Sequence, residues 1–274
     1  AQLDEQQSRL AIAQQTCEAK MHELETAQTS LAALQQQLEG ELGKLSEQQA
    51  DLFFGREREV AAFVERLREE PVLPVVGSSG VGKSSLLRAG LIPASPEGWG
   101  SLIFHPGESA FRALGRALAP EFKGDSEAIA KLVDVSDEDT AFGLVVRWRH
   151  QHGRALLIVD QFEELFTLNP IEIQTGFAAV LGRIAREGDV HVLLSMRDDF
   201  HYRCHGHEAL APVFDAITPI ATPKRADLRR AITEPAARFG FTFEDEAVVE
   251  EMLDAVEPDV RHAADPVVPR ARLA

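Results

Sequence analysis

The chain has 274 residues, which suits one sizeable domain with an appendage at roughly 100–200 residues per domain. Its 28 basic and 44 acidic residues leave a formal charge of −16, which disfavours nucleic acid or an anionic membrane surface as the main partner. No apolar run approaches about 18 residues, so we expect no membrane-spanning segment. The two cysteines, Cys17 and Cys204, provide no disulfide framework, which favours a reducing, cytoplasmic location. Because the chain begins with Ala1 instead of Met, we expect it to be a piece of a longer protein.

Residues 1–50 form a first region that is rich in Gln, Glu, Ala and Leu and contains no Pro. Its apolar residues recur every seven positions, at Leu3, Leu10, Cys17, Leu24, Leu31, Leu38 and Leu45. This period predicts a long helix that forms a left-handed coiled coil if it has a partner. The second core position is polar, with residues such as Gln14 and Gln28. Two interpretations stay open: a coiled coil for self-association or partner binding, and a single solvated helix that links the next domain to an upstream one.

The next region begins with a turn, Gly55-Arg56-Glu57, and a predicted helix that stops before Pro71. After the short apolar strand Val72–Val76 comes the pattern G-x-x-x-x-G-K-[ST], which is typical of a phosphate-binding P-loop. Small residues let successive backbone N–H groups turn toward phosphate oxygens. Lys83 would reach the β- and γ-phosphates, and the Ser84 hydroxyl would ligate Mg²⁺. The predicted nucleotide-binding residues of this loop are Gly77, Ser78, Ser79, Gly80, Val81, Gly82, Lys83, Ser84 and Ser85.

Between the P-loop and the next motif, the chain is predicted to alternate helices with a short strand. The loop is followed by a helix, Ser85–Leu91, which Gly90 and Pro93 are expected to end. A strand at 101–105 precedes helices that contain residues 111–118, end near 132, and run over 140–150. The acidic residues Asp134, Asp137, Glu138 and Asp139 lack EF-hand spacing, so we interpret them as a solvated helix start.

The second motif is the continuous apolar run Ala155–Val159, which ends in Asp160. Such a run is typical of a strand buried on both faces of a parallel sheet. After a P-loop, this is the Walker B pattern, whose Asp holds Mg²⁺ directly or through water. Glu163 and Glu164 follow, where a carboxylate could polarise an attacking water. For each Glu, an ordinary place at a helix N-terminus is the alternative.

A helix over 171–187 leads to another buried strand, residues 190–197. Ligands of open α/β sheets bind beyond the carboxyl ends of the strands, which places Ser195, Arg197 and Asp198 beside the nucleotide. Arg197 is then the candidate sensor of the γ-phosphate, with an ion pair to Asp198 or Asp199 as the alternative. The His/Cys segment 201–207 lacks the spacing of a zinc site, so we predict no zinc there.

The end of the chain is predicted to be helical after a last short strand within 215–221. Amphipathic helices are expected over 225–239 and 245–256. Residues 261–274 contain two prolines and no periodicity, so we interpret them as an aberrant or disordered tail.

Four segments together carry a resemblance to a known family: Phe54-Gly-Arg-Glu, the P-loop, Val-Asp-Gln-Phe-Glu-Glu-Leu-Phe and Leu-Ser-Met-Arg-Asp-Asp-Phe. In this order they resemble the bacterial novel STAND NTPases, signal-transduction ATPases related to NACHT and AP-ATPases. The resemblance covers about residues 51–256. It implies a three-layer α/β P-loop NTPase core over 51–221 with a parallel sheet of order 5-1-4-3-2, and a helical lid domain that starts within 222–260.

The resemblance also implies roles for particular residues. It places the turn of Gly55, Arg56 and Glu57 near the adenine, makes Asp160 the Mg²⁺ carboxylate and makes Arg197 the sensor arginine. It implies a switch that is closed with ADP and oligomerises with ATP through the NTPase core, with effector modules upstream and sensor modules downstream.

The chain departs from this family pattern in its last residues, which lack the Gly-x-Leu-Pro-Leu-Leu segment of the helical domain. Codons permitted for residues 261–272 include choices that restore a similar segment after a one-base shift, so we hypothesise a frameshift. Three functions stay open: a slow ATP-hydrolysing switch, a nucleotide-binding coiled-coil scaffold, and a replication-initiator-like AAA+ ATPase. The last is disfavoured by the net charge.

Overall fold

The structure is a computed structural model that describes residues 20, 50–123, 125–133, 137–214 and 216–264. Contacts between Cα atoms divide the chain into two units, 1–49 and 50–274, and the second unit is described below. Apart from Lys20 and Ala50, the predicted coiled-coil-like helix of residues 1–50 lies outside the described residues.

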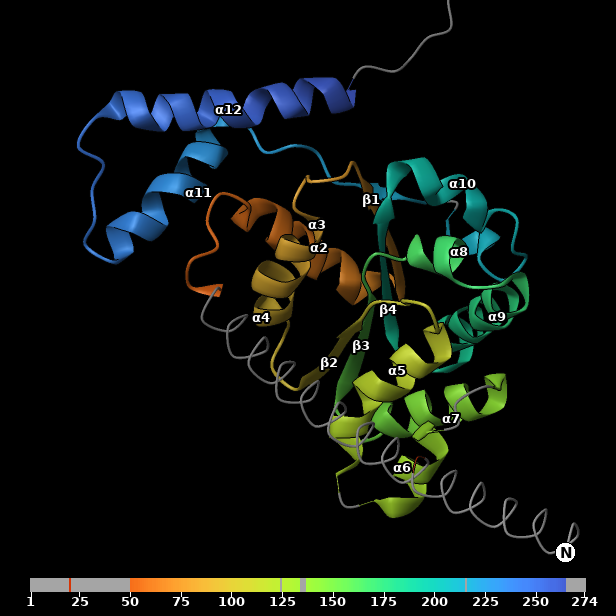
Figure 1. The fold of residues 1–274 in the computed structure, drawn as a ribbon. Helices are drawn as coiled ribbons and strands as arrows, with labels where there is room; N and C mark the ends of the chain where they lie inside the picture. The colour runs from red at the N-terminus through yellow and green to blue at the C-terminus, as the bar shows by residue number, and fades with distance from the viewer. Residues whose placement is uncertain (1–19, 21–49, 124, 134–136, 215, 265–274) are drawn as a thin grey trace, which may run out of the picture. The chain divides into compact units, whose positions relative to one another are not determined.

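A five-stranded parallel sheet forms the centre of the fold, in the order β2-β3-β4-β1-β5 (Figure 1). This is the predicted order 5-1-4-3-2, which is thereby confirmed. The central strands β1, β3 and β4 are almost continuously buried, because helices cover both faces of the sheet. The strands are β1 Val72–Gly77, β2 Trp99–Phe104, β3 Arg154–Val159, β4 His191–Arg197 and β5 Thr218–Pro219.

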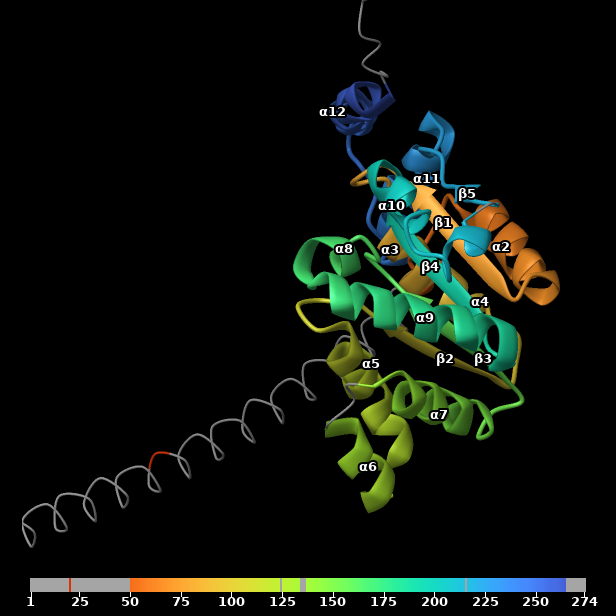
Figure 2. The same cartoon turned by 90° about the vertical axis from the view of Figure 1, so that its right-hand side faces the viewer.

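Helices pack on both faces of this sheet and form two separate apolar cores (Figure 2). One core joins the sheet to α2 and the helical segment after the P-loop, and the other joins it to α5, α7 and α9. The layer structure therefore agrees with the predicted three-layer fold. The α-helices are α2 Glu57–Glu69, α3 Lys83–Ser85, α4 Ile92–Ala94, α5 Ala110–Leu118, α6 Ser126–Val133, α7 Glu138–Arg149, α8 Glu164–Leu168, α9 Ile171–Glu187, α10 His201–Cys204, α11 Arg225–Arg238 and α12 Glu246–Ala264.

The helical segment after the P-loop is longer than the sequence predicts. It runs through α3, a π-helical turn Leu86–Leu91 and α4 to Ala94, so Gly90 does not end it. A Cβ on Gly90 would lie 2.7 Å from Val60 Cγ2 and 2.8 Å from Phe53 Cε1. Gly90 thus permits close packing against α2 and its approach. Pro93 is the second residue of α4 and directly follows the π-helical turn, so it does not end the helical segment either.

The start of α7 and the end of α12 can be compared with the predictions. Three of the four acidic residues begin α7: Asp137 caps the helix by accepting a hydrogen bond from Thr140 N at 2.7 Å, and Glu138 and Asp139 lie in its first turn. Asp134 lies outside the described residues. Helix α12 continues past residue 256, where it was predicted to end, and includes residues 261–264 of the predicted tail. The rest of that tail, 265–274, lies outside the described residues.

Helices α11 and α12 pack against each other with little apolar burial. Helix α11 has no buried residue, and α12 contributes Val249 and Leu253. Ion pairs connect the two helices, including Arg225 with Asp254 at 2.7 Å and Arg229 with Glu246. The described helices include none that is long and apolar enough to cross a membrane.

Candidate functional site

The P-loop connects β1 to α3 at the carboxyl end of the sheet's strands. Gly80 and Gly82 have φ angles of +77° and +88°, which residues with a Cβ rarely adopt. The Lys83 ammonium folds back over the loop, and its Nζ donates hydrogen bonds to Gly77 O at 2.7 Å and to Ser78 O at 2.9 Å. The loop is therefore a compact cradle, with Lys83 and Ser84 in the first turn of α3.

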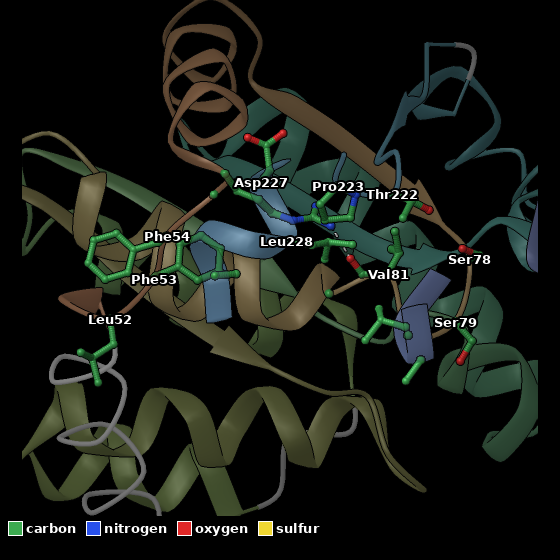
Figure 3. A pocket seen from close by; sticks show the side chains of 17 residues that line it. Leu52, Phe53, Phe54, Ser78, Ser79, Val81, Thr222, Pro223, Asp227 and Leu228 are labelled. Carbon is green, nitrogen blue, oxygen red and sulfur yellow. Dashed lines mark hydrogen bonds between the residues drawn. The ribbon is translucent and has the colours of Figure 1, made fainter. Parts of the chain in front are cut away.

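A cavity of about 740 Å³ lies between the P-loop, the segment before α2, and helices α11 and α12 (Figure 3). In Figure 3, Leu52, Phe53 and Phe54 lie at one end, and Ser78 and Ser79 lie at the other. The cavity thus has an apolar end at Leu52, Phe53 and Phe54 and a polar end at the P-loop. It is lined by Leu52, Phe53, Phe54, Gly55, Arg56, Ser78, Ser79, Gly80, Val81, Gly82, Thr222, Pro223, Asp227, Leu228, Ala231, Ala255 and Val256.

The predicted Gly55-Arg56-Glu57 turn joins the P-loop to α11. Gly55 has φ +91°, and a Cβ on it would lie 2.3 Å from Asp227 O in α11. The Arg56 side chain is 7% exposed, and its Nη2 donates to Val81 O at 2.5 Å. Burial is the main cause that lowers the pKa of Arg56. Glu57 accepts hydrogen bonds from Arg230 of α11 at 2.7 and 3.0 Å, which lowers the pKa of Glu57.

Charged side chains from the carboxyl ends of β3 and β4 act on the Lys83 ammonium. Burial lowers the pKa of Lys83. The carboxylates of Glu163, Asp198 and Asp160 raise it, and Glu163 has the largest effect of the three. The Arg197 guanidinium lowers the pKa further. The P-loop, the Walker B residue Asp160 and the candidate sensor Arg197 therefore lie close together, although many residues separate them in the sequence.

Asp160 follows β3 and is 1% exposed. Its Oδ1 accepts a hydrogen bond from Gln161 N at 3.0 Å, whereas its buried Oδ2 has no hydrogen-bond partner in the described part of the chain. An uncompensated buried carboxylate oxygen is costly unless a cation neutralises it. This orphaned oxygen therefore fits a Mg²⁺ ion, which protein sites usually bind through one or two carboxylates plus phosphates and waters.

Glu163 and Glu164 have different surroundings, although the sequence treats them alike. Glu163 Oε2 accepts a hydrogen bond from Arg197 N at 3.3 Å, and this carboxylate acts on Lys83. Glu164 Oε2 accepts from Gly107 N at 2.9 Å, in the loop between β2 and α5. Glu163 thus faces the P-loop, and Glu164 fastens a neighbouring loop.

Arg197 ends β4, as predicted, and its side chain forms an ion pair with Asp199. Arg197 Nε and Nη2 donate to Asp199 at 3.0 and 2.7 Å. This is the arrangement named as the alternative to a γ-phosphate sensor, so a sensor role requires Arg197 to leave Asp199. Ser195 is fully buried, and its Oγ has no hydrogen-bond partner among the described residues.

Sequence reasoning missed several residues near the site. His105, after β2, has Nε2 3.8 Å from Asp160 Oδ2, and Arg88 of the P-loop helical segment contacts the same nitrogen at 2.8 Å. The signal for His105 was its place at a strand's carboxyl end. The sequence contains no such signal for Asp227, Leu228 and Arg230 of α11. Tertiary packing alone brings this helix to the cavity, and no local pattern predicts it.

The side chains of the His/Cys segment 201–207 belong to no cluster of metal-binding groups within the described residues. No group of three or more His, Cys, Asp and Glu side chains in the described ranges is arranged to hold a metal ion. Cys204 is fully buried, and burial raises the pKa of its thiol to about 12. Its Sγ lies 3.9 Å from Met196 Sδ, so this cysteine is part of the core.

Solved structures share the fold of this chain at low sequence identity. The Walker-type ATPase PABY2304 of Pyrococcus abyssi has a TM-score of 0.56 and 16% identity, over 75% of this chain and 63% of that chain. Cdc6p from Pyrobaculum aerophilum has a TM-score of 0.51 and 12% identity, over 73% and 54%. The Aeropyrum pernix ORC1 protein, solved in complex with DNA, has a TM-score of 0.51 and 17% identity, over 78% and 58%.

These comparisons identify the fold, and a sequence profile identifies the family. The chain spans less than two thirds of the length of the three structures. No curated protein matches it in sequence. The profile of the family Novel STAND NTPase 1 matches residues 40–265, which include the P-loop, Asp160 and helices α11 and α12. The chain is therefore a P-loop NTPase that belongs to the Novel STAND NTPase 1 family.

Proposed function

We propose that this chain is the ATP-binding part of a regulatory switch, in which ATP and ADP control the placement of α11 and α12 and ATP is hydrolysed slowly. The observation that carries this proposal is the composition of the cavity. Its walls come from the P-loop on one side and from α11 and α12 on the other. A nucleotide bound there would contact both parts, so a change in its phosphates would change how strongly α11 and α12 are held.

The residues of the chain suggest how this site would handle a nucleotide. The backbone N–H groups of the P-loop and Lys83 would bind the phosphates, and the apolar end near Phe53 and Phe54 would bind the base. Ser84 and Asp160 would hold Mg²⁺, which supplies positive charge against the phosphates when bound. Glu163 would orient the attacking water and accept its proton, since Glu164 is held by Gly107.

Nucleotide binding and turnover can be tested with four proteins: the unchanged chain, Lys83→Ala, Glu163→Gln and Glu164→Gln. Titration calorimetry with ATP and ADP should detect binding to all except Lys83→Ala. Single-turnover measurements should show hydrolysis reduced at least about 100-fold in Glu163→Gln, which is the size of a lost general base. Glu164→Gln should retain most of the rate, because its amide oxygen can still accept the hydrogen bond of Gly107.

The same experiment separates a switch from a nucleotide-binding scaffold. A scaffold would bind ATP and lose no turnover in Glu163→Gln. Equal loss in both glutamine variants would contradict the assignment of the base to Glu163. Light scattering with ATP or ADP tests the proposed self-association, which is expected to increase with ATP.

A DNA-directed function is the third possibility, because the fold is shared with an ORC1 protein solved with DNA. That likeness is one of fold, and the charge of −16 opposes the phosphate contacts that give DNA affinity. We expect no salt-dependent binding to duplex DNA in a fluorescence anisotropy titration. Binding that weakens steeply with salt would instead support the initiator-like function.

A further inference from the structure

The loop between β2 and α5, residues 105–109, lies beside Asp160. Hydrogen bonds hold this loop to Glu164 of α8 and to Asn169, the residue after α8. Glu164 Oε2 accepts from Gly107 N at 2.9 Å. Asn169, which is 7% exposed, donates from Nδ2 to Gly107 O at 2.7 Å and accepts at Oδ1 from Ala110 N at 3.2 Å. The backbone of this loop is therefore held in place next to Asp160, and with it the first residue of the loop, His105.

The His105 ring lies between a guanidinium and a carboxylate. Arg88 Nη2 is 2.8 Å from His105 Nε2. The same Nε2 is 3.8 Å from Asp160 Oδ2, which is too far for a hydrogen bond. Asp160 Oδ2 is the buried oxygen that has no hydrogen-bond partner in the described residues.

The chemistry of these groups determines where the histidine proton lies. A guanidinium has hydrogen-bond donors and no acceptor. In the Arg88 contact, His105 Nε2 must therefore accept, which places the proton of the neutral ring on Nδ1. The side of the ring nearest Asp160 then carries a lone pair, and it offers no proton to Oδ2.

We propose that Arg88 is a positioning residue that keeps His105 in the Nδ1–H tautomer, so that Asp160 Oδ2 stays available to Mg²⁺. This inference rests on the magnesium–nucleotide site of the proposed function. Without Arg88, the ring would be free to carry its proton on Nε2. A small movement would then let Nε2–H donate to Asp160 Oδ2, which would compete with the cation for that oxygen.

The tautomer can be measured without nucleotide or magnesium. Long-range ¹H–¹⁵N NMR spectra of the full chain at pH 8 distinguish the two neutral tautomers of histidine, and His105→Gln identifies the His105 signals. We expect Nδ1–H in the unchanged chain and in Arg88→Lys, which retains a donor, and Nε2–H in Arg88→Ala. The same tautomer in the unchanged chain and in Arg88→Ala would overturn the inference.

The consequence for magnesium can be measured by calorimetry with ADP in the presence and absence of Mg²⁺. Arg88→Ala should reduce the Mg²⁺-dependent gain in ADP affinity by about 10-fold, the lower end for groups that orient metal ligands. The double variant Arg88→Ala/His105→Ala should regain it, because no ring is left to compete. Arg112→Ala, which removes an exposed arginine of α5, serves as the control for charge and should leave the gain unchanged.

The outcomes separate this inference from the proposed function. A double variant that binds Mg²⁺ as weakly as Arg88→Ala would overturn the inference, since Arg88 would then act by another route. An unchanged chain whose ADP affinity does not depend on Mg²⁺ would overturn the proposed magnesium site, and the inference with it. An unaltered His105 tautomer in Arg88→Ala would overturn the inference alone.

Discussion

Gly55 allows helix α11 to approach the turn before α2 closely. Its φ of +91° and the 2.3 Å between its ideal Cβ position and Asp227 O both exclude a larger side chain. A single missing methyl group thus permits the contact that forms one wall of the cavity beside the P-loop. The sequence motif Gly-Arg-Glu acquires a physical reason here, because each of its residues reaches a different partner.

We expect Gly55→Ala to destabilise the protein by about 1–3 kcal/mol through backbone strain and the clash with Asp227. It should also weaken ADP binding, because α11 is displaced. Gly98→Ala is a matched control: its φ is +84°, and no atom lies within 4 Å of its ideal Cβ position. Chemical denaturation measures both. Equal losses in the two variants would show that strain alone, without the clash, accounts for the effect.

The Cys204 thiol should resist modification in the folded protein. With a pKa of about 12, roughly one thiol in ten thousand is ionised at pH 8, and the thiolate is the reactive form. In Cys17→Ser, which leaves Cys204 as the single cysteine, we expect no labelling by a thiol reagent at pH 8 until denaturant is added. Rapid labelling of the native protein would contradict the burial of this side chain.

At the scale of elements, α2 and α11 are connected through Glu57 and Arg230. Arg230 also pairs with Glu234 of its own helix, so it bridges two carboxylates. Both Glu57 and Arg230 are substantially exposed, at 49% and 42%. Such a pair contributes little to global stability but favours one placement of α11 over others.

This pair predicts a pH dependence with a definite sign. The pKa of Glu57 is lowered from 4.5, mainly by the hydrogen bond from Arg230. A carboxyl whose pKa is lower in the folded state contributes stability above its unfolded pKa and loses it as pH falls through the folded pKa. We therefore expect the unchanged chain to be more stable than Glu57→Gln at pH 7, and this difference to shrink as the pH falls below 4.5 and through the lowered pKa of Glu57. Thermal unfolding of both proteins from pH 3 to 7 provides the measurement. A difference that grows toward low pH would contradict the pair.

At the scale of the whole molecule, the cavity depends on segments from both ends of the second unit. Residues 52–56 precede the sheet, and Asp227, Leu228 and Val256 follow it. The P-loop residues Ser78 and Ser79 lie at the end of the cavity opposite Leu52, Phe53 and Phe54 (Figure 3). For a nucleotide bound as proposed, we therefore expect the base and the phosphates to depend on different parts of the cavity.

Ala231→Trp tests this separation by placing an indole on the α11 wall of the cavity. An indole there should oppose the base at a cost of about 1–3 kcal/mol, which lowers the affinity for ADP by at least about 10-fold. Inorganic tripolyphosphate, which needs only the P-loop, should bind as it does to the unchanged chain. Ala237→Trp, on an exposed position of the same helix outside the cavity lining, is the control. If calorimetry shows that Ala231→Trp binds ADP and tripolyphosphate equally weakly, the substitution disturbs the whole fold, and the predicted separation is contradicted.

Much of the architecture was predictable because it depends on local patterns. Continuous apolar runs predicted β1, β3 and β4, and their order followed from the family resemblance. The P-loop was predictable because its backbone requires positive φ angles that favour glycine, as at Gly80 and Gly82. The end of the P-loop helix was predicted wrongly, since Gly90 is a packing residue against Val60 and Phe53 and not a helix stop.

The sequence by itself determined the parallel sheet, the phosphate loop and the carboxylate Asp160, because each is encoded by adjacent residues whose spacing matches a backbone geometry. Only the tertiary structure distinguished Glu163 from Glu164, added Arg88 and His105 to the site, and formed the cavity wall from α11 and α12. These features arise from contacts between segments far apart in the chain. No local period or motif reports which distant carboxylate, ring or guanidinium will lie within hydrogen-bond distance.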